Sequence, residues 1–122
     1  MATIQPTITD VSGDGTALLF VWVLGNADDG APISDQYIQL SDCCVDAIGT
    51  FGGATVVFEG SNGGVTYGTL NNVQGTTISA VAALPPKQVA EVPRFRRPRT
   101  SGGTGTAITF GALCRRQQPA RT

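Results

Sequence analysis

Short apolar segments separated by glycine-rich turns run through most of the sequence. Turn motifs rich in residues that tolerate a positive φ are "SGDGT" at 12–16, "NADDG" at 26–30, "GSNGG" at 60–64 and "SGGTG" at 101–105. Charged residues make up only 14% of the chain, and the helix-favouring residues Lys, Glu and Met are scarce. No segment has a convincing helical period. The sequence therefore predicts an all-β domain.

The predicted architecture is a two-sheet antiparallel sandwich, jelly-roll-like, with about eight strands. The predicted strands are Thr3–Thr9, Thr16–Leu24, Gln36–Leu40, Thr55–Glu59, Thr66–Leu70, Thr76–Ala82, Gln88–Arg97 and Ala107–Leu113. A length of 122 residues is typical of one domain. We expect a single sandwich domain over residues 1–114 and a polar C-terminal tail over residues 115–122.

The longest apolar run is "ALLFVWVL", from Ala17 to Leu24. A strand with one face in water alternates polar and apolar residues, and this run does not, so both of its faces need cover. One interpretation is a central strand beneath loops. The other is a strand that buries one face in a homo-oligomer, a dimer or trimer, with Phe20 and Trp22 at the interface. The run is too short to span a bilayer, and no membrane partner is expected.

Charge is distributed unevenly along the chain. Residues 1–59 contain eight carboxylates and no Lys or Arg, whereas residues 60–122 contain all eight basic residues and a single carboxylate, Glu91. If this asymmetry survives folding, it favours ordered contact with other copies of the chain or with a charged partner.

The three cysteines are Cys43, Cys44 and Cys114. An odd number with two adjacent members does not resemble a disulfide framework, which favours a reducing cytoplasm. The N-terminal "MATIQPTITD" lacks the basic and apolar regions of a secretory leader. Adjacent cysteines are poorly placed to chelate zinc, and "DDG" at 28–30 lacks the alternating ligands of a calcium loop. We expect no metal and no cofactor.

The chain contains no histidine. Histidine is the commonest general base and the usual partner of a nucleophilic Ser or Cys. The sequence also lacks the motifs of a nucleophile elbow, a P-loop and a dinucleotide-binding turn. It therefore predicts that the protein is not an enzyme.

The segment "PRFRRPR", residues 93–99, holds four of the eight basic residues. A strand there would place Arg94 and Arg96 on one face and Phe95 on the core side, and its prolines favour a sheet edge. Arginines on such an edge could simply prevent random strand pairing. Phosphate binding is disfavoured because the chain is net acidic with few aromatics, so nucleic acid is an unlikely partner. The remaining interpretation is a protein interface, since arginine pairs with carboxylates and tolerates partial burial. Its residues would be Arg94, Arg96, Arg97 and Arg99.

Two segments carry a resemblance to a known group of proteins. "VVFEGSNGGVTYGTL" (56–70) and "EVPRFRRPRTSGGTGTAITF" (91–110) resemble the small jelly-roll decoration or cement proteins of tailed bacteriophage heads. The shared pattern is a strand ending in E-G-S-N-x-G, a nearby Tyr or Trp, and then P-R-[FY]-x-R-P before a glycine turn. The same segments also resemble galactose-binding-like sandwiches, although Gly63 and Gly64 stand where Asp-Gly is usual and Tyr67 stands for Trp.

The first resemblance implies a structural virion protein on the capsid exterior, assembled in the host cytoplasm. Its partner would be the major capsid protein, whose neighbouring subunits it would cement. The four arginines would pair with capsid carboxylates or with the acidic half of a sister copy. The alternative is a carbohydrate- or receptor-binding module of a phage tail or fibre. A nucleic-acid-associated protein inside the particle is a third possibility.

Overall fold

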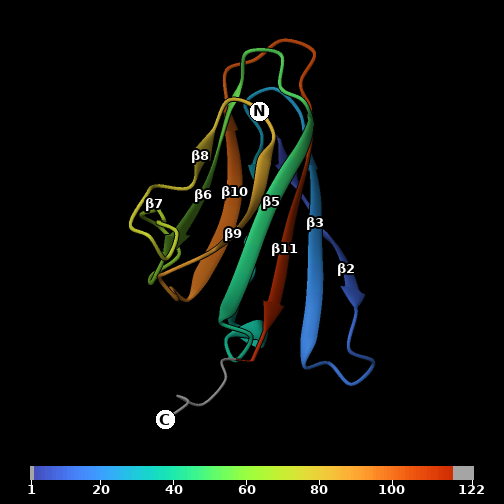
Figure 1. Ribbon diagram of the computed structural model, residues 1–122, viewed down its shortest axis with the longest axis vertical. Coiled ribbons are helices and arrows are strands. Elements are labelled where there is room, and N and C mark those ends of the chain that lie inside the picture. Colours follow the sequence, from blue (N-terminus) through green and yellow to red (C-terminus); the bar gives the residue numbers. More distant parts are fainter. Residues whose placement is uncertain (1, 117–122) are drawn as a thin grey trace.

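The computed structural model describes residues 2–116 and contains two facing β-sheets (Figure 1). Eleven strands and one short 3-10 helix, η1 (Asp35–Tyr37), occur within these residues. Sheet A contains β1 (Thr3–Ile4), β4 (Asp29–Gly30), β6 (Thr55–Ser61), β7 (Gly68–Thr69), β8 (Ser79–Ala80) and β10 (Phe95–Ser101). Sheet B contains β2 (Thr7–Asp10), β3 (Ala17–Leu24), β5 (Asp42–Thr50), β9 (Leu84–Gln88) and β11 (Ala107–Arg115). The predicted all-β sandwich is confirmed, with more strands than expected because several are very short.

The strand pairing is nested. Sheet A has the order β1-β4-β10-β6-β7, with β8 also pairing with β6, and sheet B has the order β2-β3-β11-β5-β9. The consecutive strands β5 and β6 lie in opposite sheets, as do β10 and β11. Because β5 pairs with β11 while β6 pairs with β10, one pair encloses the other along the sequence, as in a jelly roll. Every strand pair except β1–β4 is antiparallel.

One hydrophobic core fills the space between the sheets. Phe20 and Trp22 of β3 point into it together with Phe110 of β11 and Phe58 of β6. The Phe58 and Phe110 rings stack at 5.5 Å, and the Trp22 Nε1 donates a hydrogen bond to the Ala31 carbonyl at 3.0 Å. Phe20 and Trp22 are only 1% and 0% exposed, so their predicted role as interface residues is wrong. They are the inward half of β3.

Several predicted strands differ from the structure. The segment Gln36–Leu40 is not a strand, because η1 and a following turn form local hydrogen bonds from Tyr37 N to Ser34 O and from Leu40 N to Tyr37 O. The predicted strand Thr3–Thr9 is divided near Pro6 into β1 and β2, which belong to different sheets. Strand β5 was not predicted, although Cys43, Val45 and Ala47 alternate inward along it. The small residues and Gly49 obscured that pattern.

Strand β10 differs from its prediction in both position and orientation. It lies between β4 and β6 rather than at an edge. Arg96 and Pro98 face the core, while Phe95, Arg97 and Arg99 face outward, which reverses the predicted sides. The predicted strand Gln88–Arg97 is in fact the end of β9, a connecting segment and the start of β10.

A central position for β10 is possible because its proline meets a gap in the hydrogen-bond ladder. The backbone N–H groups of Arg96 and Thr100 donate to Ile33 O and Asp28 O on the β4 side. Pro98 lies midway between them, so its missing N–H would point the same way. The strand there is β4, only two residues long, and a Cβ added to Gly30 would lie 2.7 Å from Pro98 Cδ. Proline is therefore tolerated beside a glycine of a very short neighbouring strand.

Strand β11 extends to Arg115, one residue into the predicted tail, and residues 117–122 of that tail lie outside the described residues. Within the described chain, no helix is long and apolar enough to cross a membrane.

Candidate functional site

The outward face of sheet A carries a compact charged network. Glu59 of β6 and Arg97 of β10 are direct cross-strand partners, and Arg97 Nε donates to Glu59 Oε1 at 2.8 Å. Arg99 Nε donates to both Glu59 oxygens at 3.2 Å. Asp29 of β4 adds a longer contact, 3.9 Å from Arg97 NH1. Two arginines and two carboxylates thus compensate one another, so this face is charged locally but neutral in sum. We call these four residues the charged network.

Aromatic rings complete this surface. The Arg97 guanidinium lies 3.8 Å from the centre of the Tyr67 ring, within cation–π distance. Arg94, which precedes β10 and is exposed, lies over the Phe95 ring at 5.0 Å. Arg97 is therefore held by a carboxylate and a ring together. Within residues 2–116, the hydrogen bonds of Arg99 all come from Nε, which leaves its two terminal nitrogens available to a partner.

The four predicted interface arginines therefore do not act as one set. Arg97 and Arg99 lie together on the outward face, and Arg94 is exposed nearby in sequence. Arg96 is only 1% exposed and points into the sandwich. Its inclusion in a surface interface is wrong, because the period of two in a strand separates it from Arg97.

Arg96 instead contacts two cysteines, Cys43 and Cys114, for which the sequence predicted neither a disulfide framework nor a metal site. Arg96 NH1 donates to the Leu40 carbonyl at 2.8 Å and to Cys43 Sγ at 2.7 Å, and NH2 donates to the Tyr37 carbonyl at 3.4 Å. Cys43 Sγ lies 2.7 Å from Cys114 Sγ. This cluster joins β10 to β5, β11 and the η1 segment at one end of the sandwich (Figure 1). This cluster could have been predicted only if the sequence pattern had identified β5 as a strand.

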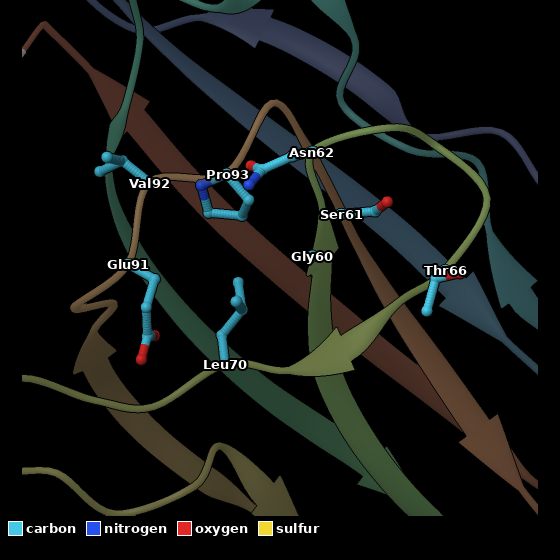
Figure 2. Close-up of a pocket in the computed structure, with 8 residues that line it drawn as sticks. All are labelled: Gly60, Ser61, Asn62, Thr66, Leu70, Glu91, Val92 and Pro93. Atoms are coloured by element: carbon cyan, nitrogen blue, oxygen red, sulfur yellow. The ribbon is translucent and has the colours of Figure 1, made fainter.

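An open cleft of about 500 Å³ lies beside the end of β6 (Figure 2). Its lining residues are Gly60, Ser61, Asn62, Thr66, Leu70, Glu91, Val92 and Pro93. Glu91 is fixed by Asn71, whose backbone N–H and side-chain amide donate to its two oxygens at 2.7 and 2.8 Å. These bonds hold the pKa of Glu91 below its usual value. A Cβ on Gly60 would overlap Pro93, so the floor of the cleft requires glycine.

The outward face of sheet B is apolar over much of its central strands, although it also carries the exposed Asp46 and the ion pair of Arg115 with Asp42. Its residues on the three central strands include Leu19, Val21, Val23, Ile48 and Leu113. Val23 and Ile48 are 59% and 63% exposed. Over Gly111, which lacks a side chain, the face is hollowed by a cavity of about 280 Å³ between Leu19, Pro86 and Leu113. We call this surface the apolar face. It explains why "ALLFVWVL" does not alternate.

No group of three or more His, Cys, Asp or Glu side chains within the described chain could hold a metal ion. The carboxylates of Glu59 and Glu91 each accept hydrogen bonds from neighbouring side chains, and Glu91 also accepts one from the backbone N–H of Asn71. The two outer faces differ in kind, because one offers charge and the other apolar area.

The comparisons with known proteins do not assign the chain to a group. No family model matches it, and no curated protein matches its sequence.

Proposed function

We propose that the protein is a structural virion component that binds the outer surface of a bacteriophage capsid and cements neighbouring major capsid subunits. The observation that carries the proposal is the pair of chemically different outer faces, the charged network on sheet A and the apolar face on sheet B. A cement protein has to hold two bodies at once. A rigid sandwich with a distinct binding surface on each side meets that need.

The charged network supplies the chemistry for a protein partner. Arg99 keeps its terminal nitrogens free while Glu59 fixes its Nε, so the guanidinium is oriented before binding. An oriented guanidinium loses less entropy when it forms a bidentate pair with a carboxylate. A phosphate backbone is a poorer match, because Glu59 and Asp29 neutralise the local positive charge. The capsid group that we expect opposite Arg99 is an Asp or Glu side chain.

Such binding would stabilise the capsid shell by mass action. A protein that binds only the assembled shell stabilises the shell in proportion to its occupancy, and many copies add their effects. The proposal therefore requires saturable binding at a fixed ratio to capsid subunits.

The test is cosedimentation of the purified protein with empty, expanded shells of its virus, with free DNA as a parallel sample. Saturable binding to shells and not to DNA is expected. A protein that stays in the supernatant with shells at every concentration would remove the capsid proposal.

Variants locate the contact. Arg99→Gln keeps a donor for Glu59 but removes the charge, and it is expected to weaken shell binding about tenfold or more, the scale of a lost charge-assisted pair. Arg116→Gln removes the same charge at an exposed residue outside both sheets, and this matched control is expected to bind like the parent. Equal binding by all three proteins would exclude the charged network as the contact surface.

A second candidate function is glycan binding in the cleft, because Asn62, Thr66 and Glu91 present polar groups in an open hollow (Figure 2). Sugar sites also need an exposed aromatic face, and Arg97 already covers one face of the nearby Tyr67. Binding on a glycan array that Asn62→Ala abolishes would favour this function over capsid binding.

A further inference from the structure

Arg96 is a buried cation that is only 1% exposed. No ion pair among the described side chains includes it. Backbone carbonyls of Leu40 and Tyr37 accept from its terminal nitrogens, and its Nε has no hydrogen-bond partner among the same described residues. Carbonyl oxygens solvate a guanidinium but do not neutralise it. A buried charge is costly unless an opposite charge accompanies it.

An acidic group in direct contact with this cation is the Cys43 thiol. Its sulfur lies 2.7 Å from Arg96 NH1 and 2.7 Å from Cys114 Sγ, whereas Cys114 Sγ is 4.0 Å from NH1. A Cys43 thiolate could accept from both neighbours at once, the Cys114 S–H and the Arg96 N–H. In that ionisation state Cys114 is the donor of the S–H···S bond and Cys43 carries the negative charge.

The directions in which the surroundings move the two thiol pKa values agree with this geometry. The Cys114 hydrogen bond and the Arg96 charge lower the pKa of Cys43 against the opposing effects of burial and of Asp42. The same hydrogen bond, together with burial, raises the pKa of Cys114. Tyr37 faces the cluster from η1 through its carbonyl oxygen.

We propose that Cys43, Cys114 and Arg96 form a buried redox site, in which a Cys43 thiolate is the counterion of Arg96 and a small peroxide oxidises Cys43 and Cys114 to a reversible disulfide. The reactive form is set by the arginine, and Cys114 is the resolving thiol.

The backbone places the two sulfurs for this bond. Cys43 and Cys114 are direct cross-strand partners. The backbone carbonyl of Cys43 accepts a hydrogen bond from the Val89 N–H of the β9 side. The backbone polar groups of Cys43 therefore point toward β9 and away from β11. The two residues therefore form a non-hydrogen-bonded pair, the closer kind, with a typical Cα separation of about 4.5 Å. That separation lies within the range of disulfides, about 4.4–6.8 Å.

The reaction balances with one peroxide. The Cys43 thiolate attacks one peroxide oxygen, the O–O bond breaks, and the leaving hydroxide takes up a proton to form water. Cys114 sulfur then displaces the hydroxyl from the Cys43 sulfenic acid, and its own proton leaves with that hydroxyl as a second water. The two sulfurs lose two electrons in total, and the peroxide gains them.

Cys44 differs from Cys43 in both its position and its pKa. It is adjacent to Cys43 but its side chain lies on the outward face of sheet B, beside the cavity over Gly111. Burial and the neighbouring Asp46 raise the pKa of Cys44, which opposes thiolate formation. A full-length Cys44→Ser protein retains only Cys43 and Cys114, so any intramolecular disulfide in it joins those two.

The experiment treats folded Cys44→Ser protein with hydrogen peroxide and measures its intact mass without reductant. Loss of two hydrogen atoms, reversed by dithiothreitol, is expected. The same loss should be absent when Cys43→Ser or Cys114→Ser is added. A protein that keeps its mass, or gains oxygen atoms without forming a disulfide, would overturn the proposal.

A second readout tests the counterion directly. The thiolate absorbance in the ultraviolet is measured against pH, and a thiolate that persists at neutral pH and disappears in Cys43→Ser is expected. Arg96→Met should remove it and slow peroxide oxidation about tenfold, since each unit of pKa changes the thiolate fraction about tenfold. If Arg96→Met does not fold, the ultraviolet absorbance of the Cys44→Ser protein at neutral pH tests on its own whether the thiolate is present. Absence of thiolate at neutral pH would overturn the role of Arg96.

Discussion

Glu59 is the residue on which the charged network depends. It is almost fully buried beneath the two arginines that it binds, although it lies on the outward side of sheet A. The arginines themselves retain 22% and 36% exposure of their side chains. Solvent therefore weakens each pair, but the carboxylate between two cations also prevents their mutual repulsion.

We predict that Glu59→Gln lowers the free energy of unfolding by about 1–3 kcal/mol, less than for a fully buried pair because both arginines reach solvent. Urea unfolding measures the change, and the loss should shrink at high salt. Asp46→Asn, an exposed carboxylate on sheet B, is the matched control and should be nearly neutral. A Glu59→Gln protein as stable as the parent would mean that the network adds nothing to folding.

The buried redox site of Cys43, Cys114 and Arg96 predicts that the free energy of unfolding rises and then falls as the pH increases. The pKa of Cys43 is lower in the folded state than its ordinary 9.0, so folded protein binds fewer protons and the free energy of unfolding rises with pH up to that value. The pKa of Cys114 is raised, so above 9.0 the unfolded state loses a proton that the folded state keeps, and stability falls.

Denaturant unfolding across this pH range, under reducing conditions, should therefore show a rise and then a fall in Cys44→Ser protein. Cys43→Ser should lack the rise below the ordinary thiol pKa, since the carboxylates common to both proteins cancel in the comparison. Parallel curves for the two proteins would contradict the lowered pKa of Cys43.

At the scale of elements, β10 shows how a proline enters the middle of a sheet. Its ring packs against Gly30 of β4, where any side chain would crowd it. We predict that Gly30→Ala lowers the free energy of unfolding by about 1–3 kcal/mol through overpacking. In a double-mutant cycle, Pro98→Ala should recover part of this loss, because it removes the crowded ring.

Gly68→Ala is the matched control, since β7 leaves open space at that position. Thermal or urea unfolding of the four proteins of the cycle and this control measures the coupling. Additive effects of Gly30→Ala and Pro98→Ala would show that their contact does not limit the substitution.

Some elements of this fold can be predicted from the sequence and others cannot, depending on whether local residues determine them. The all-β class and strands β3, β6 and β11 follow from local apolar runs and turn residues. The orientation of β10 could not follow, because the inward Arg96 is stabilised by the carbonyls of Tyr37 and Leu40 and by the thiol of Cys43, which are distant from it in the sequence. The arginine motif is evident in the sequence, but alternation with a period of two cannot show which face of the strand is buried when both faces carry polar residues. Only the pairing of β5 with β11 brings Cys43 to Cys114.

At the scale of the whole molecule, the apolar face is the surface available for a second copy. We predict self-association in solution, which Val23→Asp and Ile48→Asp should weaken because both side chains are exposed there and a charge opposes burial. Sedimentation velocity over a range of concentrations measures it.

Val65→Asp is the control, since Val65 is 88% exposed and lies outside sheet B. Its association should equal that of the parent protein. A parent protein that stays monomeric at the highest concentration would exclude a homo-oligomer built on this face, and would leave the surface to a different partner.

The central place of β11 in sheet B has a consequence for biosynthesis. This strand fills the gap between β3 and β5, yet it is the last of all the described strands to leave the ribosome. Until then both neighbours have an unpaired edge, and the inward aromatic residues of β3 lack their main cover. Sheet B therefore cannot be completed until β11 has been synthesised. The nascent chain is most prone to aggregate just before β11 emerges, while the edges of β3 and β5 that it will cover are still exposed.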